Sequence, residues 1–197
     1  MHPVIQRLAR QLFNNKQSAT EKIEVAFHYV RDDIQHSWDI QNKVVTCSAA
    51  DVAEVGHGIC YAKSNLLSAL LRSQGIPTGF CYQRLMLFDT PDKGYCLHAL
   101  NAVYIAEEDR WIRLDARGNK PCVNAQFSLV KEQLAFSITI DLDEVEYKTI
   151  YAVPLEDTIQ VLRSNVDALY MYRNRLPAAI IEEQSLPVRK KAKGENK

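Results

Sequence analysis

The sequence lacks long hydrophobic runs and paired cysteines, and each absence excludes a class of protein. No stretch approaches the ~18 apolar residues of a membrane-spanning helix. Residues 1–10 have no long apolar segment and no small-residue cleavage site, so we expect no signal peptide. No CxxC pair occurs among the five cysteines, which are Cys47, Cys60, Cys81, Cys96 and Cys122. A secreted disulfide framework is usually even in number and denser, so we expect a cytoplasmic protein with free thiols.

An excess of either charge is also missing. Basic and acidic residues both number 24, so the formal net charge is zero. Residues 189–197 hold five of the basic groups and one acid, which leaves a mildly acidic body. Nucleic-acid-binding domains usually present a basic face, so we expect no nucleic-acid partner and no membrane partner. Residues 182–197 are predicted to form a disordered basic tail, and the oligomeric state stays open.

Helical patterns precede strand patterns along the chain, which indicates an α+β fold. We expect helices at 20–35, 49–55 and 59–74, and strands at 79–88, 97–105 and 110–115. A further strand pair at 135–140 and 146–153 and a last helix at 155–173 complete the expected elements. A chain of this length typically forms one domain, which we place at residues 1–181.

Cys60 is the first candidate for chemistry, because it lies at the opening of the helix at 59–74 and follows the segment Gly56-His57-Gly58-Ile59. Unpaired amides at a helix N-terminus favour negative charge and therefore a reactive thiolate. The same amides can donate hydrogen bonds to an oxyanion when the sulfur attacks a carbonyl. The alternative is that Cys60 is a small buried hydrophobic residue.

His98 and Asp115 are the second and third candidates, because a hairpin can bring them together. With a loop of two or four residues around Glu107 and Glu108, Asp115 lies opposite Leu100. Leu100 shares a sheet face with His98, so His98 and Asp115 become diagonal neighbours. A loop of three or five residues would place them on opposite faces. An acid beside a histidine orients the imidazole, as the base of a thiol nucleophile requires.

Three segments of the chain carry a family pattern. They are GICYAKSNLLSALLRSQGIP at 58–77, HALNAVYI at 98–105 and RWIRLD at 110–115, with a looser match in YVRDDI at 29–34. Together they resemble the transglutaminase-like superfamily over about residues 47–118, especially its microbial members assigned as cysteine proteases. The resemblance implies a papain-like core, with the nucleophile helix packed on an antiparallel β-sheet that carries the histidine and the acid.

The resemblance also implies roles for the three residues. Cys60 would be the nucleophile, His98 the general base and then acid, and Asp115 the orienting group of a catalytic triad. The implied chemistry is acyl transfer from a protein, peptide or amide substrate through a thioester, without a cofactor or a metal. We favour a thiol-dependent amidase or peptidase. The alternatives are a protein-glutamine transglutaminase or acyltransferase, and a catalytically silent binding module.

The chain departs from the family pattern near the histidine and the acid. Leu100 stands where the family commonly has an aromatic residue, and Asn101 stands where it commonly has an acid. After Asp115 the chain continues Ala-Arg-Gly, where the family often has Pro-Thr. These changes leave the three residues intact and affect the expected substrate preference. The acidic segment at 141–146 lacks the glycine and the alternating ligands of a calcium loop.

A second oxyanion donor should come from the segment before the catalytic helix. Gln35, His36 and Trp38 can each donate a hydrogen bond, and we choose Trp38 because an indole N–H is a fixed donor. The alternative for Trp38 is a core residue, and Asp39 is an alternative residue for holding the site together.

Two other kinds of site fit the sequence less well. His57, Cys60, Cys81, Cys96 and His98 include the right atoms for zinc but not the paired spacing of structural zinc sites. A serine hydrolase of the G-x-S-x-G type is excluded because that motif does not occur.

Overall fold

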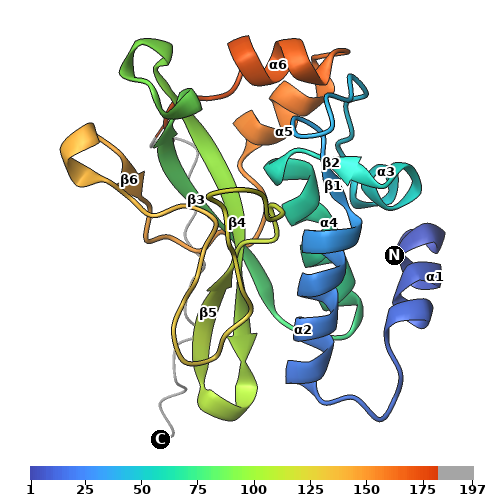
Figure 1. Cartoon of the computed structure of the whole chain (residues 1–197). Helices are drawn as coiled ribbons and strands as arrows, with labels where there is room; N and C mark the ends of the chain where they lie inside the picture. The colour runs from blue at the N-terminus through green and yellow to red at the C-terminus, as the bar shows by residue number, and fades with distance from the viewer. Residues whose placement is uncertain (182–197) are drawn as a thin grey trace, which may run out of the picture.

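A four-stranded antiparallel sheet with the order β5-β4-β3-β6 forms the centre of the computed structural model, which describes residues 1–181 (Figure 1). The predicted tail at 182–197 lies outside the described residues. The strands are β1 Gln35–His36, β2 His57–Gly58, β3 Thr78–Met86, β4 Tyr95–Ile105, β5 Arg110–Leu114 and β6 Val145–Glu146. The helices are α1 Pro3–Leu12, α2 Ala19–His28, α3 Ala49–Val55, α4 Cys60–Ser73, α5 Glu156–Arg163 and α6 Ala168–Asn174. None of the helices within residues 1–181 is long and apolar enough to cross a membrane.

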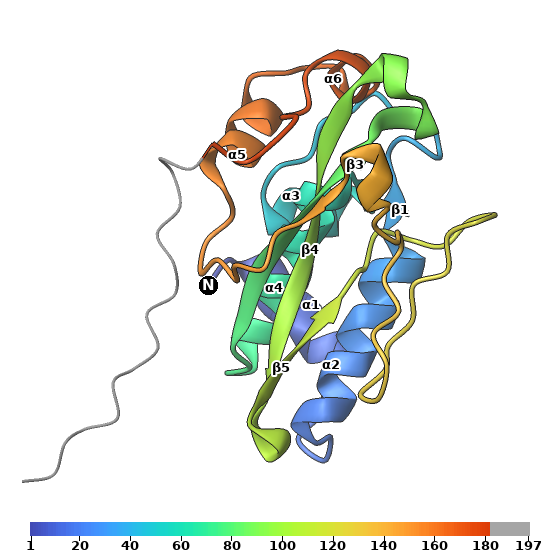
Figure 2. The same cartoon turned by 90° about the vertical axis from the view of Figure 1, so that its left-hand side faces the viewer.

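The buried helix α4 is the core of the molecule. Its predicted apolar stripe, which consists of Leu66, Leu67, Leu70 and Leu71, has no exposed surface. The stripe belongs to one cluster that also contains residues of α1, α2, β3 and β4. Figure 2 shows the sheet in front of α4 and α2, so the helices cover one face of the sheet. Each fully buried leucine contributes roughly 1.5–3 kcal/mol, which makes this layer the main source of stability.

The hairpin between β4 and β5 has the register that the sequence predicts. Residues 106–109 form a four-residue loop, and Asn101 lies opposite Leu114. The next pair of positions is Leu100 and Asp115, so the predicted juxtaposition of Asp115 with His98 follows from this register. Helices followed by an antiparallel sheet confirm the predicted α+β class.

The helix predicted at 20–35 is shorter in the structure. Ser18 caps α2 in a capping box with Glu21, and α2 ends at His28. A π-helical turn over Tyr29–Asp33 follows, in which the Ile34 amide donates to the carbonyl of Tyr29. The chain then enters β1. The first helix, α1, was not among the expected elements.

The segment from 135 to 153 contradicts the predicted strand pair. Residues 135–140 form no strand, because the amides of Ala135 and Thr139 donate to the carboxylates of Asp115 and Glu144 instead. Of the expected second strand only the edge strand β6 and an isolated bridge between Tyr151 and Phe80 are present.

The prediction of one helix at 155–173 is wrong, because two helices, α5 and α6, occupy this range. Asp167 accepts hydrogen bonds from the amides of Leu169 and Tyr170, so it caps a new helix, α6. The Asn165 side chain binds the Val161 carbonyl at the end of α5. Both residues favour a break between the helices over one continuous helix.

We predict that Leu70→Ala lowers the free energy of unfolding by about 2–5 kcal/mol, because the cavity it leaves is enclosed on all sides. Urea unfolding measures this loss. Val153→Ala is the control, since Val153 is 67% exposed and should change stability by less than about 0.5 kcal/mol. Equal losses for the two variants would show that α4 is not the core layer.

Candidate active site

The approach of the chain to Cys60 is fixed by Gly58, the last residue of β2. A Cβ atom on Gly58 would lie 2.9 Å from the Thr46 hydroxyl oxygen and 3.0 Å from the Ala62 Cβ, so no larger residue fits. Ile59 is the N-cap of α4 and supplies no side-chain hydrogen bond to the first amides. Cys60 therefore stands at a helix start whose positive end has no capping side chain.

His98 and Asp115 form a buried pair. The His98 Nε2 atom lies 2.8 Å from Asp115 Oδ2, and the side chains are 5% and 1% exposed. Cys60 and His98 lie together in the lining of one cleft. Because Asp115 occupies Nε2, Nδ1 is the nitrogen that remains for the sulfur. The structure thus brings together the three predicted residues in the order thiol, imidazole and carboxylate.

Backbone amides hold the Asp115 carboxylate in place. The Ala135 amide donates to Oδ2 at 3.1 Å and the Arg117 amide donates to Oδ1 at 3.2 Å. Burial raises the pKa of Asp115, but the charge of His98 and these hydrogen bonds outweigh burial and keep the pKa below its usual range. Asp115 is therefore ionised and directed at the imidazole.

The electrostatics of the pair favour a protonated histidine. Burial lowers the pKa of His98, whereas the charges of Asp115 and Cys60 and the hydrogen bond to Asp115 raise it to about 10. A protonated imidazole beside a thiolate is the resting state of an activated cysteine nucleophile. The ring of Phe136 packs edge-on against His98, with centroids 5.1 Å apart, and covers the imidazole.

The parallel pair β1–β2 brings Trp38 to the same place. Gln35 pairs with His57 and His36 pairs with Gly58, and the Ser37 amide donates to the Gly58 carbonyl at 3.1 Å. Trp38 follows in the turn after β1, and it lines the same cleft as Cys60. The turn that carries Trp38 therefore lies beside the start of α4.

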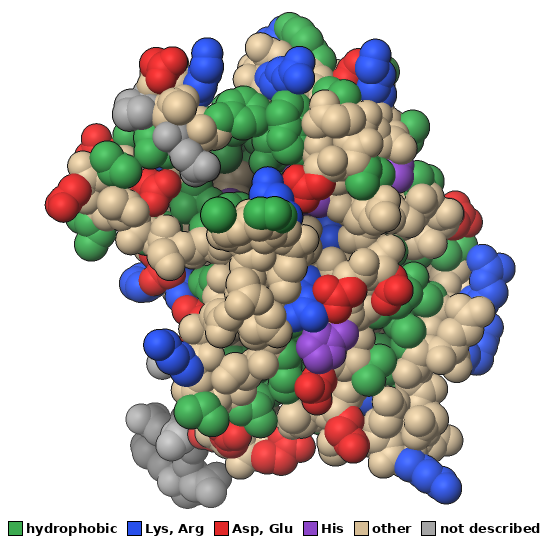
Figure 3. Space-filling model, viewed as in Figure 1, with side chains coloured by type: hydrophobic (Ala, Val, Ile, Leu, Met, Phe, Trp, Pro, Cys, Tyr) green, Lys and Arg blue, Asp and Glu red, His purple; other side chains and the backbone are tan. Residues whose placement is uncertain are grey.

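A cleft of about 600 Å³ contains Cys60, His98 and Trp38 together. In Figure 3 hydrophobic side chains surround a hollow on the face shown, below the level of α6 in Figure 1. Its apolar and aromatic lining residues include Leu85, Met86, Leu87, Phe88, Cys96, Leu97, Ala135, Phe136, Leu142, Tyr172 and Leu176. Its polar lining residues are Arg117, Lys120, Ser137, Thr139 and Glu144, and Cys122 also borders it.

The other two candidates for the oxyanion donor lie elsewhere. Gln35 is exposed and does not line the cleft. His36 is buried, and burial together with the charge of Arg117 holds the pKa of its ring well below the usual range, so it is neutral. Its ring packs edge-on against Tyr172 and lies behind the cleft lining.

Two buried cations near the cysteine are not predicted by sequence reasoning. Lys63 is 1% exposed, and its ammonium donates to the carbonyls of Ile34 and Arg31, which closes the π-helical turn. A lysine three residues after Cys60 in an otherwise apolar helix is a sequence signal that could have indicated this buried cation. Arg117 is 3% exposed and follows Asp115 by two residues, and no motif marks it.

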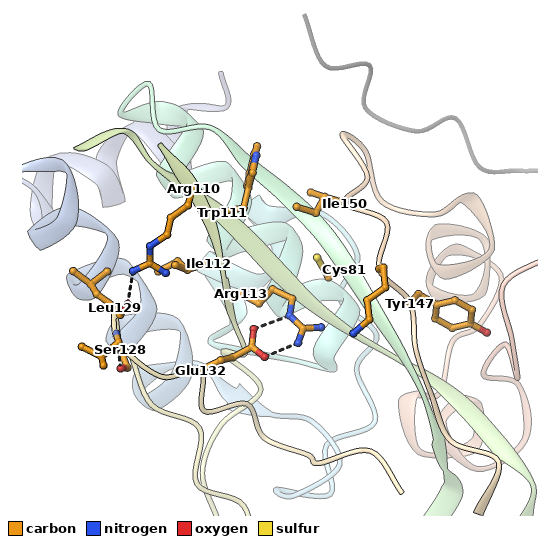
Figure 4. Close-up of a pocket in the computed structure, with 12 residues that line it drawn as sticks. Cys81, Arg110, Trp111, Ile112, Arg113, Ser128, Leu129, Glu132, Tyr147 and Ile150 are labelled. Carbon is orange, nitrogen blue, oxygen red and sulfur yellow. Dashed lines mark hydrogen bonds and ion pairs between the residues drawn. The ribbon is translucent and has the colours of Figure 1, made fainter. Parts of the chain in front are cut away.

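The groups proposed for zinc do not gather in the structure. Among residues 1–181 no set of three or more His, Cys, Asp or Glu side chains could hold a metal ion. The His57 Nδ1 atom is bonded to the Ser37 hydroxyl at 2.9 Å, and Cys81 lines another pocket of about 350 Å³ (Figure 4). That pocket contains neither Cys60 nor His98.

A helix that begins with a cysteine, packed on an antiparallel sheet that presents a histidine and an aspartate, is the arrangement of papain-like folds. The chain belongs to the transglutaminase-like superfamily, since the profile of that family matches residues 6–116, which is more than half of the chain. The resemblance stated from the three sequence segments is thereby confirmed. No curated protein matches the chain.

Two solved structures are similar to this chain at low identity. One is described as a putative cysteine protease from Cytophaga hutchinsonii, with 23% identity, a TM-score of 0.43, and coverage of 57% of this chain and 36% of that chain. The other is described as a TGase, with 18% identity, a TM-score of 0.48, and coverage of 90% of this chain and 51% of that chain. The chain thus spans about a third to a half of the length of these proteins.

We predict that Lys63 makes stability rise with pH. Burial and the nearby Arg117 charge lower the pKa of Lys63 from 10.5 to about 7, so between these values the unfolded chain binds a proton that the folded chain does not. The cost of burying the ammonium is complete below pH 7 and disappears as the pH rises to 10.5. Thermal denaturation at pH 7 and pH 9.5 should therefore show Lys63→Met losing stability relative to the wild type as the pH rises.

Lys43→Met is the control for this measurement, because the Lys43 side chain is 75% exposed. Its stability difference from the wild type should be the same at both pH values. The same behaviour for Lys63→Met would contradict the assignment.

Proposed function

We propose that the protein is a thiol-dependent amide or peptide hydrolase that acts through a Cys60–His98–Asp115 triad. The observation that carries this proposal is the buried His98–Asp115 pair together with Cys60 and His98 in the lining of one cleft. Membership of the transglutaminase-like superfamily supports the same chemistry. The substrate is proposed to be a protein, peptide or amide, with no nucleic-acid or membrane partner.

The proposed reaction has two half-reactions. The Cys60 thiolate attacks the amide carbonyl carbon, and the π electrons move onto oxygen to form a tetrahedral oxyanion. His98 gives its Nδ1 proton to the leaving nitrogen, the C–N bond breaks, and a thioester and a free amine result. His98 then takes a proton from water, the hydroxide displaces the sulfur, and the carboxylic acid leaves.

The residues around the triad have supporting roles in this proposal. The oxyanion would accept hydrogen bonds from the Cys60 amide at the start of α4 and from the Trp38 indole N–H. Asp115 stabilises the imidazolium through both half-reactions. All five cysteines are free, which suits the reducing cytoplasm that we propose as the compartment.

The first test is labelling of the native protein with iodoacetamide at pH 6, followed by peptide mapping. We expect Cys60 to react fastest despite being 5% exposed, because the proposed base His98 lies in the same cleft lining. Cys122 is exposed and reports the rate of an ordinary thiol in the same sample. His98→Ala should abolish the fast labelling. Equal labelling of Cys60 and Cys122 would favour the silent binding module.

The second test is a set of triad variants assayed against peptide and amide libraries. Cys60→Ala should abolish turnover with an unchanged circular dichroism spectrum, and His98→Ala should reduce turnover roughly 10²–10⁴-fold. Asp115→Ala should reduce it less. Turnover that survives in Cys60→Ala would refute the nucleophile assignment.

Adding a fluorescent primary amine to the same assays separates hydrolysis from transfer. Release of the free acid with little incorporation of the amine supports the hydrolase. Predominant incorporation of the amine into protein glutamines would replace the hydrolase by the transglutaminase alternative.

A further inference from the structure

Arg117 is a buried cation in the cleft wall that the proposed reaction does not use. Its side chain is 3% exposed, and its guanidinium binds both carboxylate oxygens of Asp39, with Nη2 2.9 Å from Oδ1. Burial raises the pKa of Asp39, but the hydrogen bonds and the charge of Arg117 outweigh burial and keep that pKa below its usual range. Both members of the pair are therefore ionised. A buried guanidinium is costly unless it is paired in this way, so Arg117 depends on Asp39, whose Oδ1 also lies 3.3 Å from the Lys120 ammonium.

The pair connects the triad to the Trp38 turn. The backbone amide of Arg117 donates to Asp115 Oδ1 at 3.2 Å, and its side chain reaches the residue directly after Trp38. Gly118 then turns the chain away with a φ of 112°, and a Cβ there would lie 3.3 Å from the Arg31 carbonyl oxygen. One short segment thus binds the triad acid through its backbone and the Trp38 turn through its side chain.

Aromatic contacts hold the Trp38 ring, and backbone hydrogen bonds within residues 36–42 shape its turn, such as that from the Asp39 amide to the His36 carbonyl at 2.9 Å. The indole stacks on Tyr172, with centroids 4.8 Å apart and an interplanar angle of 16°, and it also contacts Phe88 at 5.2 Å. The Arg173 guanidinium lies 5.0 Å from the ring. Stacking restrains the plane of the ring, but a ring can slide within that plane. A bidentate ion pair on the next residue ties the turn from which the indole extends to the segment that follows Asp115.

We propose that Asp39 and Arg117 are positioning residues for acyl transfer, whose ion pair holds the Trp38 indole N–H toward the oxyanion of the tetrahedral intermediate. This inference rests on the proposed function. An oxyanion donor has to be held within about 0.5 Å of its productive position, so an anchor one residue away has kinetic consequences. Loss of one oxyanion donor typically costs about 10²–10³-fold in rate.

A second arginine–carboxylate pair provides the matched control. Arg113 also binds both carboxylate oxygens of Glu132, here through Nε, which lies 2.7 Å from Oε2, and Nη2, in the pocket of Figure 4. Glu132 does not line the cleft of Cys60. Glu132→Gln and Asp39→Asn therefore make the same chemical change, away from the site and next to it.

The experiment compares two reactions of Cys60. Iodoacetamide alkylates the sulfur by displacement at a saturated carbon, which forms no oxyanion. p-Nitrophenyl acetate acylates it through a tetrahedral oxyanion and releases p-nitrophenolate. We expect Asp39→Asn to slow acylation by about tenfold or more while alkylation stays within about twofold, because only acylation needs Trp38. Glu132→Gln should change neither rate.

A double variant tests whether the pair acts through Trp38. Trp38→Phe alone should slow acylation by roughly 10²-fold, and Trp38→Phe with Asp39→Asn should be no slower. Arg117→Lys keeps the charge but not the two-pronged contact, so it should fall between the wild type and Asp39→Asn. Multiplied losses in the double variant, or an equal loss of alkylation in Asp39→Asn, would overturn the inference.

A physical readout keeps the inference separate from the proposed function. The chain has two tryptophans, so Trp38 is the only one left in a Trp111→Phe background. Asp39→Asn should then increase acrylamide quenching of Trp38, and Glu132→Gln should not. A wild-type protein that does not react with the ester refutes the proposed function, whereas unchanged quenching in Asp39→Asn refutes the positioning role.

Discussion

The packing of α4 against the antiparallel sheet is the interaction on which both the fold and the candidate site depend. The helix is held along its length by leucines with no exposed surface. At its first turn the Tyr61 hydroxyl donates to the Leu97 carbonyl of β4 at 2.8 Å. That bond joins the residue after Cys60 to the residue before His98. The distance between thiol and imidazole is therefore set by rigid elements, and no loop has to be ordered to form the pair.

The same burial removes charged side chains from water, which costs free energy, and oppositely charged partners offset that cost for two of them. His98, Arg117 and Lys63 are cations that are nearly inaccessible to water. His98 is compensated by Asp115, and Arg117 is compensated by Asp39. Within residues 1–181 Lys63 donates to the carbonyls of Ile34 and Arg31, and burial together with the Arg117 charge lowers its pKa to about 7. Buried charges without a strong partner are the exception near this cleft.

The parts of the site that the sequence predicts are those set by periodicity and by hairpin register. The apolar stripe and the glycine stops place α4 to within one residue at each end, and a four-residue loop puts Asp115 beside His98. The place of Trp38 depends on β1 and β2, two strands of two residues each, which are too short to leave a pattern. Lys63 and Arg117 form contacts between segments far apart in the sequence, and residue type alone does not indicate such partners.

The segment over Asp115 shows why the later part of the chain was predicted poorly. In the expected strand at 135–140 the backbone amides would donate hydrogen bonds to carbonyls of a neighbouring strand. In the structure Ala135 gives its amide to Asp115, and Phe136 covers His98. A backbone amide that local propensity assigns to a sheet thus serves as a hydrogen-bond donor in the candidate site.

The departure from the family pattern after Asp115 gains a physical meaning from these contacts. Where the family often has Pro-Thr, this chain has Ala116 and Arg117. The backbone amide at Arg117 still serves the carboxylate of Asp115, but its long side chain introduces a buried charge that requires an acid within reach. Asp39 supplies that acid from the turn beside Cys60. An arginine two residues after the third sequence segment and an aspartate far ahead of it thus form one contact, and loss of Asp39 alone would leave the buried guanidinium without its carboxylate.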